Sequence, residues 1–317
     1  MKSDYVWMDG ELVPFEQATV HVINPTLHYG VGVFEGIRCY QTRQGPAVFR
    51  LRDHLQRLLD SIHILGIRDF PYSPEVMRAA VHQLILVNNF QECYIRPLMY
   101  LQGPMGMNMD NSHPRLSIAA WEWGPYLGDE SKKTGIHMMV SSLTRLHPNV
   151  NMTKSKVTGN YVNSLLIKTL ALRSGYDEAV ILDSEGFVAE CTGENLFMVR
   201  CGVLYTPPRA SVLEGITRDS ILTLASDLGI PVREELITRD QLYVSDEVFI
   251  SGTAAELVPI RMIDYRQVGD GIPGPIYQLL MEAYMANVHG KGIHSQVWLD
   301  YVRVGQPVND EKVLIDL

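Results

Sequence analysis

The sequence has few cysteines, no long apolar run and no excess of positive charge. No stretch approaches the roughly 20 uninterrupted apolar residues of a membrane-spanning helix. The first ten residues, MKSDYVWMDG, lack the apolar segment of a signal peptide. We therefore expect a cytoplasmic protein that contacts no membrane. The cysteines are far apart and form no CxxC pair, which argues against a disulfide framework and any metal site; they are Cys39, Cys93, Cys191 and Cys201.

The formal net charge of −9 argues against nucleic acid as a partner, because such binding needs a basic surface. An anionic small molecule remains possible, since backbone amides or one arginine can bind a phosphate group. An apolar fraction of 46 % is that of an ordinary globular protein. The length of 317 residues exceeds the usual size of one hydrophobic core, so we expect two domains.

Strand and helix signals alternate along the chain and predict an α/β (α+β) fold. Asp9-Gly10 is a two-residue hairpin signal between two short strands. Ser73-Pro74 predicts the start of a helix, because serine suits the N-cap and proline the first turn. Apolar periodicity predicts further helices and strands: the helices cover 52–65, 160–173 and 217–228, and the strands cover 31–40, 94–101, 116–121, 136–143, 178–204 and 248–250.

The polar stretch 124–134, GPYLGDESKKT, separates two strand-like segments and is the predicted interdomain loop. This division gives a small N-terminal α/β domain at 1–123. A larger C-terminal domain follows at 135–317, with a cleft between the two.

Two lysines, Lys154 and Lys156, stand in NMTKSKVTGNYVNSLL directly before an expected helix. A lysine amine can form an imine with an aldehyde cofactor if burial or a neighbouring charge lets it lose its proton. Most lysines are solvated surface charges, however. Small residues after Lys156 favour it as a buried group, but spacing alone does not choose between the two.

Two turns could bind an anion. Glu214–Thr217 opens a helix, so its free amides and the helix dipole favour negative charge. Ser251–Ala255 follows a strand and offers hydroxyls and amides together. Arg57, on the first long helix, is a further candidate. Each of these features alone is also consistent with an ordinary helix cap or an exposed arginine.

Glu190 lies in the apolar stretch VAECTGENLFMV. A carboxylate there is costly to bury without a positive partner. A protonated pyridine nitrogen is such a partner, and the pairing strengthens the electron sink of the ring. Glu194 in the same stretch is the competing candidate.

Together these motifs resemble the class IV aminotransferases of pyridoxal-phosphate fold type IV, and specifically the branched-chain amino-acid aminotransferases. The resemblance runs nearly end to end and is highly specific in its order. It implies a two-domain D-amino-acid aminotransferase-like architecture with pyridoxal 5′-phosphate in the cleft. The motifs are YVWMDGELV, LHYGVGVFEGIRCY, CYIRPL, AAWEWGPYLG, KVTGNYVNSLL, EGFVAECTGENLF, GITRD and DEVFISGTAAELVPI.

The resemblance assigns the cofactor site residue by residue. It implies that Lys156 is the catalytic lysine and holds the cofactor as a Schiff base. Glu190 then pairs with the pyridinium nitrogen, and Tyr161 reaches the phenolic oxygen of the ring. Leu213 packs on the ring face. Contacts to the phosphate fall on Arg57, Ile216, Thr217, Gly252 and Thr253.

The same resemblance implies an apolar substrate pocket with one cation. Arg96 binds the γ-carboxylate of glutamate, so one pocket accepts acidic and branched side chains. The α-carboxylate meets Tyr94 and the amides of the Thr253-Ala254 turn. The full substrate-binding set is Tyr29, Phe34, Gly36, Tyr94, Arg96, Trp123, Tyr126 and Ala254.

The implied reaction is a reversible ping-pong transamination that converts L-leucine, L-isoleucine or L-valine and 2-oxoglutarate into branched 2-oxo acids and L-glutamate. Its partners are small amino acids and 2-oxo acids, and the resemblance implies at least a homodimer. Three alternatives stay open: D-amino-acid or (R)-amine transamination, an aminodeoxychorismate lyase, and a non-catalytic binding protein.

Overall fold

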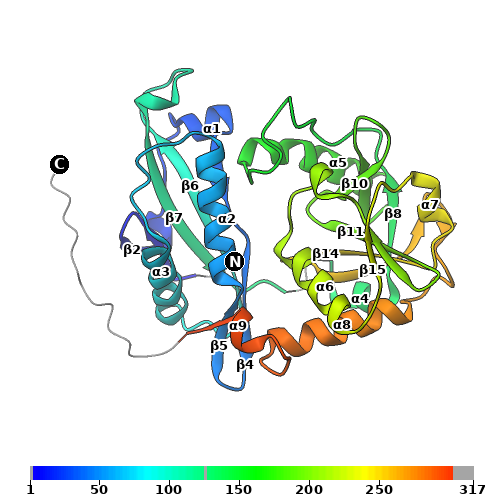
Figure 1. Cartoon of the computed structure of the whole chain (residues 1–317). Helices are drawn as coiled ribbons and strands as arrows, with labels where there is room; N and C mark the ends of the chain where they lie inside the picture. Colours follow the sequence, from blue (N-terminus) through cyan, green and yellow to red (C-terminus); the bar gives the residue numbers. More distant parts are fainter. Residues whose placement is uncertain (1–2, 125–126, 303–317) are drawn as a thin grey trace.

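The computed structural model describes residues 3–124 and 127–302, and its strands form two sheets (Figure 1). The described strands of the first sheet run in the order β17-β5-β4-β6-β7-β1-β2, and β3 also pairs with β6. Their bounds are β1 Tyr5–Met8, β2 Glu11–Pro14, β3 Gly32–Phe34, β4 Ile37–Thr42, β5 Gly45–Phe49, β6 Cys93–Gln102, β7 His113–Trp121 and β17 Leu299–Tyr301.

Two amphipathic helices cover this first sheet, α2 (Leu51–Ile64) and α3 (Pro74–Val87) (Figure 1). Leu58 of α2 and Leu84 of α3 are fully buried in one core cluster with Ile95 of β6. The short helix α1 (Pro25–Tyr29) begins at Asn24, whose side chain accepts hydrogen bonds from the next free amides. The packing within the core cluster fixes α2 against β3 and β6.

The second sheet has the order β10-β9-β8-β15-β14-β11-β12-β13 among the described residues, with β16 on β15. Its bounds are β8 Ile136–Val140, β9 Glu178–Leu182, β10 Val188–Cys191, β11 Asn195–Arg200, β12 Val203–Thr206, β13 Val232–Glu234, β14 Glu247–Gly252, β15 Glu256–Ile263 and β16 Arg266–Gln267. The accompanying helices are α4 Asp129–Thr134, α5 Tyr161–Arg173, α6 Ile216–Asp227, α7 Arg239–Tyr243, α8 Pro275–Val288 and α9 Ser295–Trp298.

The mixed helix and strand content confirms the predicted α+β fold class. The predicted hairpin is also confirmed, because Asp9 and Gly10 have φ angles of 49° and 103° between β1 and β2. Ser73 caps α3, since its hydroxyl oxygen accepts from the Val76 amide at 3.3 Å. Within the predicted interdomain loop, residues 129–134 form α4.

The single strand predicted over residues 31–40 is wrong in one detail: it is divided into β3 and β4. Both strands pair with β6, and the division falls at Glu35 and Gly36, opposite Pro97 and Arg96. Pro97 has no amide to donate, so the ladder loses a hydrogen bond at that point. Glu35 still donates its own amide to the Pro97 carbonyl at 3.0 Å.

The last described strand, β17, lies within residues 135–317, which the sequence predicts as the C-terminal domain. It pairs antiparallel with β5 of the first sheet, with Leu299 opposite Phe49. The chain returns there by way of α8 and α9 (Figure 1). The physical reason is that β5 would otherwise be an open edge, and β17 satisfies its backbone groups.

Candidate active site

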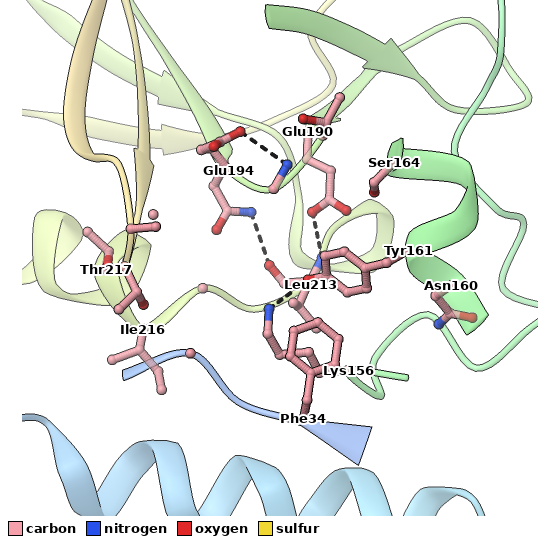
Figure 2. A pocket seen from close by; sticks show the side chains of 18 of the residues that line it. Phe34, Lys156, Asn160, Tyr161, Ser164, Glu190, Glu194, Leu213, Ile216 and Thr217 are labelled. Atoms are coloured by element: carbon pink, nitrogen blue, oxygen red, sulfur yellow. Dashed lines mark hydrogen bonds between the residues drawn. The ribbon is translucent and has the colours of Figure 1, made fainter. Parts of the chain in front are cut away.

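Residues from both sheets line one cavity of about 230 Å³, shown in Figure 2. All the predicted catalytic and cofactor-binding residues line it: Lys156, Arg57, Tyr161, Glu190, Leu213, Ile216, Thr217, Gly252 and Thr253. From the predicted substrate-binding set it is lined by Phe34, Gly36, Tyr94, Arg96, Trp123 and Ala254.

Lys156 extends into this cavity from the segment before α5 (Figure 2). Its backbone is held on both sides: its amide donates to the Ser61 hydroxyl oxygen at 3.1 Å, and its carbonyl accepts from the Phe34 amide at 3.1 Å. The amine of Lys156 lies 2.6 Å from the hydroxyl oxygen of Tyr161. A fixed backbone and a phenol neighbour give the lysine amine a defined position.

The neighbouring Lys154 does not line the cavity. Its amine donates to the Val212 carbonyl at 3.0 Å and pairs with the Glu214 carboxylate at 3.2 Å. Its side chain is 37 % exposed. The local pattern left the two lysines undecided, and the geometry favours Lys156.

Glu190, a buried residue of β10, faces both a cation and an amide. One carboxylate oxygen lies 2.5 Å from the Arg145 Nε, and the other accepts from the Leu213 amide at 2.9 Å (Figure 2). Burial raises the pKa of Glu190, while Arg145 and the Leu213 amide oppose the rise. Arg145 therefore favours the ionised form of a carboxylate that would otherwise be costly to bury.

The competing carboxylate, Glu194, lines the same cavity in a different environment. It accepts from the Gly193 amide at 3.1 Å. Burial, followed by the charge of Glu178, raises the pKa of Glu194 to about 8. Glu178 itself pairs with Lys168 at 2.7 Å. The raised pKa of Glu194 favours its neutral form, whereas Arg145 supports the charge of Glu190, so Glu190 is the better partner for a cationic ring.

Arg57 is held by a buried acid that lies on a different element. Its Nε and Nη2 donate to the two carboxylate oxygens of Glu35 at 2.6 and 2.9 Å. His54, one helical turn earlier, lies 2.7 Å from the same carboxylate. Burial alone would raise the pKa of Glu35, but Arg57 and His54 hold it well below its ordinary value. This pairing fixes the guanidinium at the edge of the cavity.

Residues of two turns line the cavity. Helix α6 begins at Ile216, and no described side chain caps its first turn. The second turn follows β14 and includes Gly252, Thr253 and Ala254. A Cβ at Gly215, just before α6, would lie 2.0 Å from the Asn195 Oδ1, so glycine is required for the close approach. Such exposed amides at a helix start favour an anion.

The aromatic side chains of Phe34, Tyr94 and Trp123 line the cavity beside Arg96 and are called the aromatic wall below. The Arg96 guanidinium lies 4.8 Å from the Phe34 ring centroid and 5.3 Å from that of Tyr94. Its Nη2 donates to the Tyr94 hydroxyl oxygen at 3.2 Å. Among the described residues, the buried Nε of Arg96 has no hydrogen-bond partner. A buried donor without an acceptor is costly, so this position favours a ligand that brings one.

Gly36 allows Tyr94 to reach its place. A Cβ at Gly36 would lie 1.9 Å from the Tyr94 hydroxyl oxygen. The Tyr94 ring also meets the Trp123 ring edge-on, with centroids 4.7 Å apart. Glycine at this position is therefore a condition for the aromatic wall.

Two predicted substrate-binding residues are not placed in the cavity. Tyr29 is 44 % exposed at the end of α1 and does not line the cavity of the single chain. The helix ends there because Gly30 adopts a left-handed conformation with a φ of 71°. Tyr126 lies outside the described residues.

The sequence reasoning missed several residues that support the site. Glu35 and His54 fix Arg57, Arg145 pairs with Glu190, and Asn195 donates to the Leu213 carbonyl at 3.0 Å. Glu35 stood inside the quoted motif VFEGIR and could have been found as a buried charge there. Arg145 gave no local signal, because its partner is far away in sequence.

Among the described residues, no helix is long and apolar enough to cross a membrane. The same part of the chain holds no group of three or more His, Cys, Asp or Glu side chains arranged to hold a metal ion.

A family profile described as amino-transferase class IV matches residues 32–263. The chain therefore belongs to the class IV aminotransferases.

Similar proteins within this class are branched-chain amino-acid aminotransferases. A branched-chain-amino-acid aminotransferase of Pseudomonas aeruginosa is 46 % identical over 303 residues, which cover 95 % of this chain and 98 % of that protein. The crystal structure of the Escherichia coli branched-chain amino acid aminotransferase is 47 % identical, with a TM-score of 0.92 and coverage of 95 % and 100 %. These matches confirm the resemblance to branched-chain aminotransferases.

Another similar structure, the branched-chain amino acid aminotransferase of T.th., was solved with pyridoxamine 5′-phosphate. It is 46 % identical, with a TM-score of 0.92 and coverage of 96 % and 100 %. A second structure of that enzyme, at 44 % identity, a TM-score of 0.91 and coverage of 96 % and 100 %, is a complex with N-(5′-phosphopyridoxyl)-L-glutamate.

Proposed function

We propose that this chain is a pyridoxal 5′-phosphate-dependent transaminase that exchanges the amino group between branched-chain L-amino acids and 2-oxoglutarate. The observation that carries the proposal is the placement of the Lys156 amine 2.6 Å from Tyr161, in the same cavity as Glu190 and Arg57. The activity of the similar branched-chain aminotransferases supports it.

The cavity residues fit this cofactor in charge and chemistry. Lys156 supplies the amine that bonds to an aldehyde, and Arg57 with the α6 and Thr253 amides suits a phosphate. Glu190 suits a protonated ring nitrogen, and Leu213 offers an apolar contact to the ring face. When bound, the cofactor acts as an electron sink for the negative charge that develops at the substrate Cα.

Lys156 is the group that moves the proton. The Lys156 Nζ would act as the base that takes the proton from the substrate Cα and delivers it to the cofactor carbon that Lys156 otherwise holds, which is the proton shift that transamination requires. Tyr161, 2.6 Å away, keeps the amine oriented by a hydrogen bond. Glu190 is held by Arg145 and the Leu213 amide, and it would be the carboxylate that pairs with the protonated ring nitrogen.

The aromatic wall and Arg96 account for two kinds of substrate. Phe34, Tyr94 and Trp123 give apolar contact to a branched side chain. Arg96 has a buried donor left over, which suits the second carboxylate of glutamate or 2-oxoglutarate. One cavity that serves both substrates in turn implies a ping-pong reaction.

Single-turnover rates with four amine donors test this function. We expect L-leucine and L-glutamate to convert the cofactor at rates at least about 100-fold above D-alanine and (R)-1-phenylethylamine, because the pocket holds one substrate geometry. Faster turnover of either of the last two would replace the branched-chain assignment with the corresponding alternative.

The exposed face of α5 supports a homodimer or a larger assembly. Only Ile167 and Ala171 of this helix are buried, although much of the remaining surface is apolar. An exposed apolar face of this kind fits a contact with a second copy of the chain. The exposed apolar residues are Val162, Leu165, Leu166, Leu170 and Leu172.

Light scattering of Leu165→Glu measures whether a second copy covers this face. We expect the wild type to be at least a dimer and the variant to dissociate, because a charge would be buried at the contact. A wild-type monomer would contradict the assembly without affecting the chemistry.

A further inference from the structure

Three charged side chains form an ion triad behind the Thr253-Ala254 turn. They are Arg38 of β4, Lys132 of α4 and Glu256 at the start of β15. Glu256 lies 3.5 Å from Arg38 and pairs with Lys132 through its other carboxylate oxygen. The three side chains are 14, 20 and 3 % exposed, and none of them lines the cavity. The triad can therefore act on the site only through its neighbours.

Arg38 connects the triad to the wall of the cavity. Its Nη1 donates to the Ala254 carbonyl at 3.2 Å, and its Nη2 donates to the Trp123 carbonyl at 3.5 Å. Both of these residues line the cavity. A planar guanidinium that holds two carbonyls fixes their relative position, which a lysine could not do in the same way.

The backbone conformation of Glu256 is unfavourable, so the ion triad is maintained at a cost in free energy. Its φ is 59°, in the left-handed region that favours glycine, although it is a buried carboxylate. A non-glycine residue held in that region has a strained backbone. It also closes the β14–β15 turn, opposite Gly252. The strained backbone keeps the carboxylate in contact with Arg38 and Lys132.

Lys132 lies in the predicted interdomain loop, so it connects that loop to the ion triad. Its carbonyl accepts from the Tyr277 hydroxyl at 3.4 Å, and that hydroxyl also reaches the Leu257 carbonyl at 3.3 Å. The Tyr277 side chain of α8 therefore links α4 to β15, in addition to the ion pair between Lys132 and Glu256.

We propose that Arg38, Glu256 and Lys132 are positioning residues that hold the Thr253-Ala254 amides where the substrate carboxylate binds. The inference rests on the proposed function, because it takes this turn to be the carboxylate site. Without Lys132, Glu256 retains only the longer contact to Arg38, and the turn loses its fixed place. Substrate affinity then falls, while Lys156 and Glu190 are untouched.

The variants Lys132→Met, Lys132→Arg and Lys133→Met test this role. Lys133 is exposed on the same helix, so its variant is a control for the loss of one charge from α4. For Lys132→Met we expect the KM for L-leucine and for 2-oxoglutarate to rise about tenfold, the effect of one hydrogen bond to a charged group. We expect kcat and the cofactor absorbance to be unchanged, and the other two variants to resemble the wild type.

Binding of 4-methylvalerate supplies a second measurement that needs no turnover. This acid has the carbon skeleton of leucine without its amino group, and Trp123 in the cavity wall can report its binding by fluorescence. We expect Lys132→Met to weaken binding about tenfold and Lys132→Arg to restore it.

Equal KM and binding in Lys132→Met and Lys133→Met would overturn the positioning role. A loss of Tm and kcat with unchanged KM would also overturn it, because that pattern indicates a purely structural ion triad. If the wild type binds 4-methylvalerate with this dependence on Lys132 but does not transaminate, the proposed function fails and the positioning role stands.

Discussion

The two ends of the cavity differ in how their charged side chains are paired. At the cofactor end, Arg57 is paired with Glu35, and Glu190 is paired with Arg145. At the substrate end, Arg96 is surrounded by aromatic rings and keeps a buried Nε without a hydrogen-bond partner among the described residues. Fixed pairs suit a ligand that is always the same. An available donor suits a ligand that carries a second carboxylate in only one half of the reaction.

The largest effect is expected from removal of the Lys156 amine at the cofactor end of the cavity. Lys156→Ala should reduce transamination by at least about 10³-fold, because no other group is placed to act as nucleophile and base. The visible absorbance of the bound cofactor should also change. Lys154→Ala is the matched control and should stay within a few-fold of the wild type. Loss of activity in the control alone would transfer the role to Lys154.

The next effect concerns the paired acid. Glu190→Gln should lower kcat about 10²-fold with a smaller change in KM, because the developing charge loses a preorganised partner. Glu194→Gln, on the same wall, should change kcat only a few-fold, since the raised pKa of Glu194 favours its neutral carboxyl form, which an amide resembles. Steady-state kinetics of both variants tests whether the two acids differ as their surroundings indicate. The opposite ranking would reassign the ring partner to Glu194.

A substitution of Arg96 should affect the acidic substrates more than the branched-chain ones. Arg96→Met should raise the KM for L-glutamate and 2-oxoglutarate about 30-fold or more, the effect of losing one buried charge partner. The KM for L-leucine should change much less, because leucine has no second carboxylate. Arg115→Met serves as control, since Arg115 is 45 % exposed and pairs with Asp9. An equal loss for both substrates would show that Arg96 only supports the aromatic wall.

The last effect is on stability rather than on turnover. The pKa of Glu194 is raised from 4.5 in an ordinary environment to about 8 in the fold, by burial and by Glu178, against the opposing charge of Lys168. Between these two pH values the unfolded chain has lost this proton and the folded chain keeps it. The free energy of unfolding should therefore fall as pH rises through that window, by up to about 1.4 kcal/mol per pH unit.

Urea unfolding of the wild type and Glu194→Gln between pH 5 and pH 8 measures this dependence. The variant should show a flatter profile, because its amide does not titrate. The same slope in both proteins would mean that another group carries the pH dependence.

Local patterns predicted much of the fold, because the signals lay within a few residues of one another. The Asp9-Gly10 turn and the Ser73 cap are of this kind. The division at Glu35 was missed because it depends on Pro97, which lies on another strand. The β5–β17 pair joins residues about 250 positions apart, a contact that no local pattern can indicate.

The candidate site shows the same limit. The ordered motifs located the lining residues, including the choice of Lys156, which spacing left open. Arg145 and His54 were missed, since each matters only through a partner on a different element. Tyr29 was expected in the cavity, but its place depends on where α1 ends and on surfaces beyond one chain.

The pairing of β17 with β5 has a consequence for the order of folding during synthesis. The ribosome delivers residues 299–301 about 250 residues after β5, so β5 stays an unprotected edge while the second sheet is being synthesised. The N-terminal half alone would expose that edge to other chains, and a cut within residues 124–134 would not yield two independently folding pieces. The first sheet is thus begun before the second and completed after it.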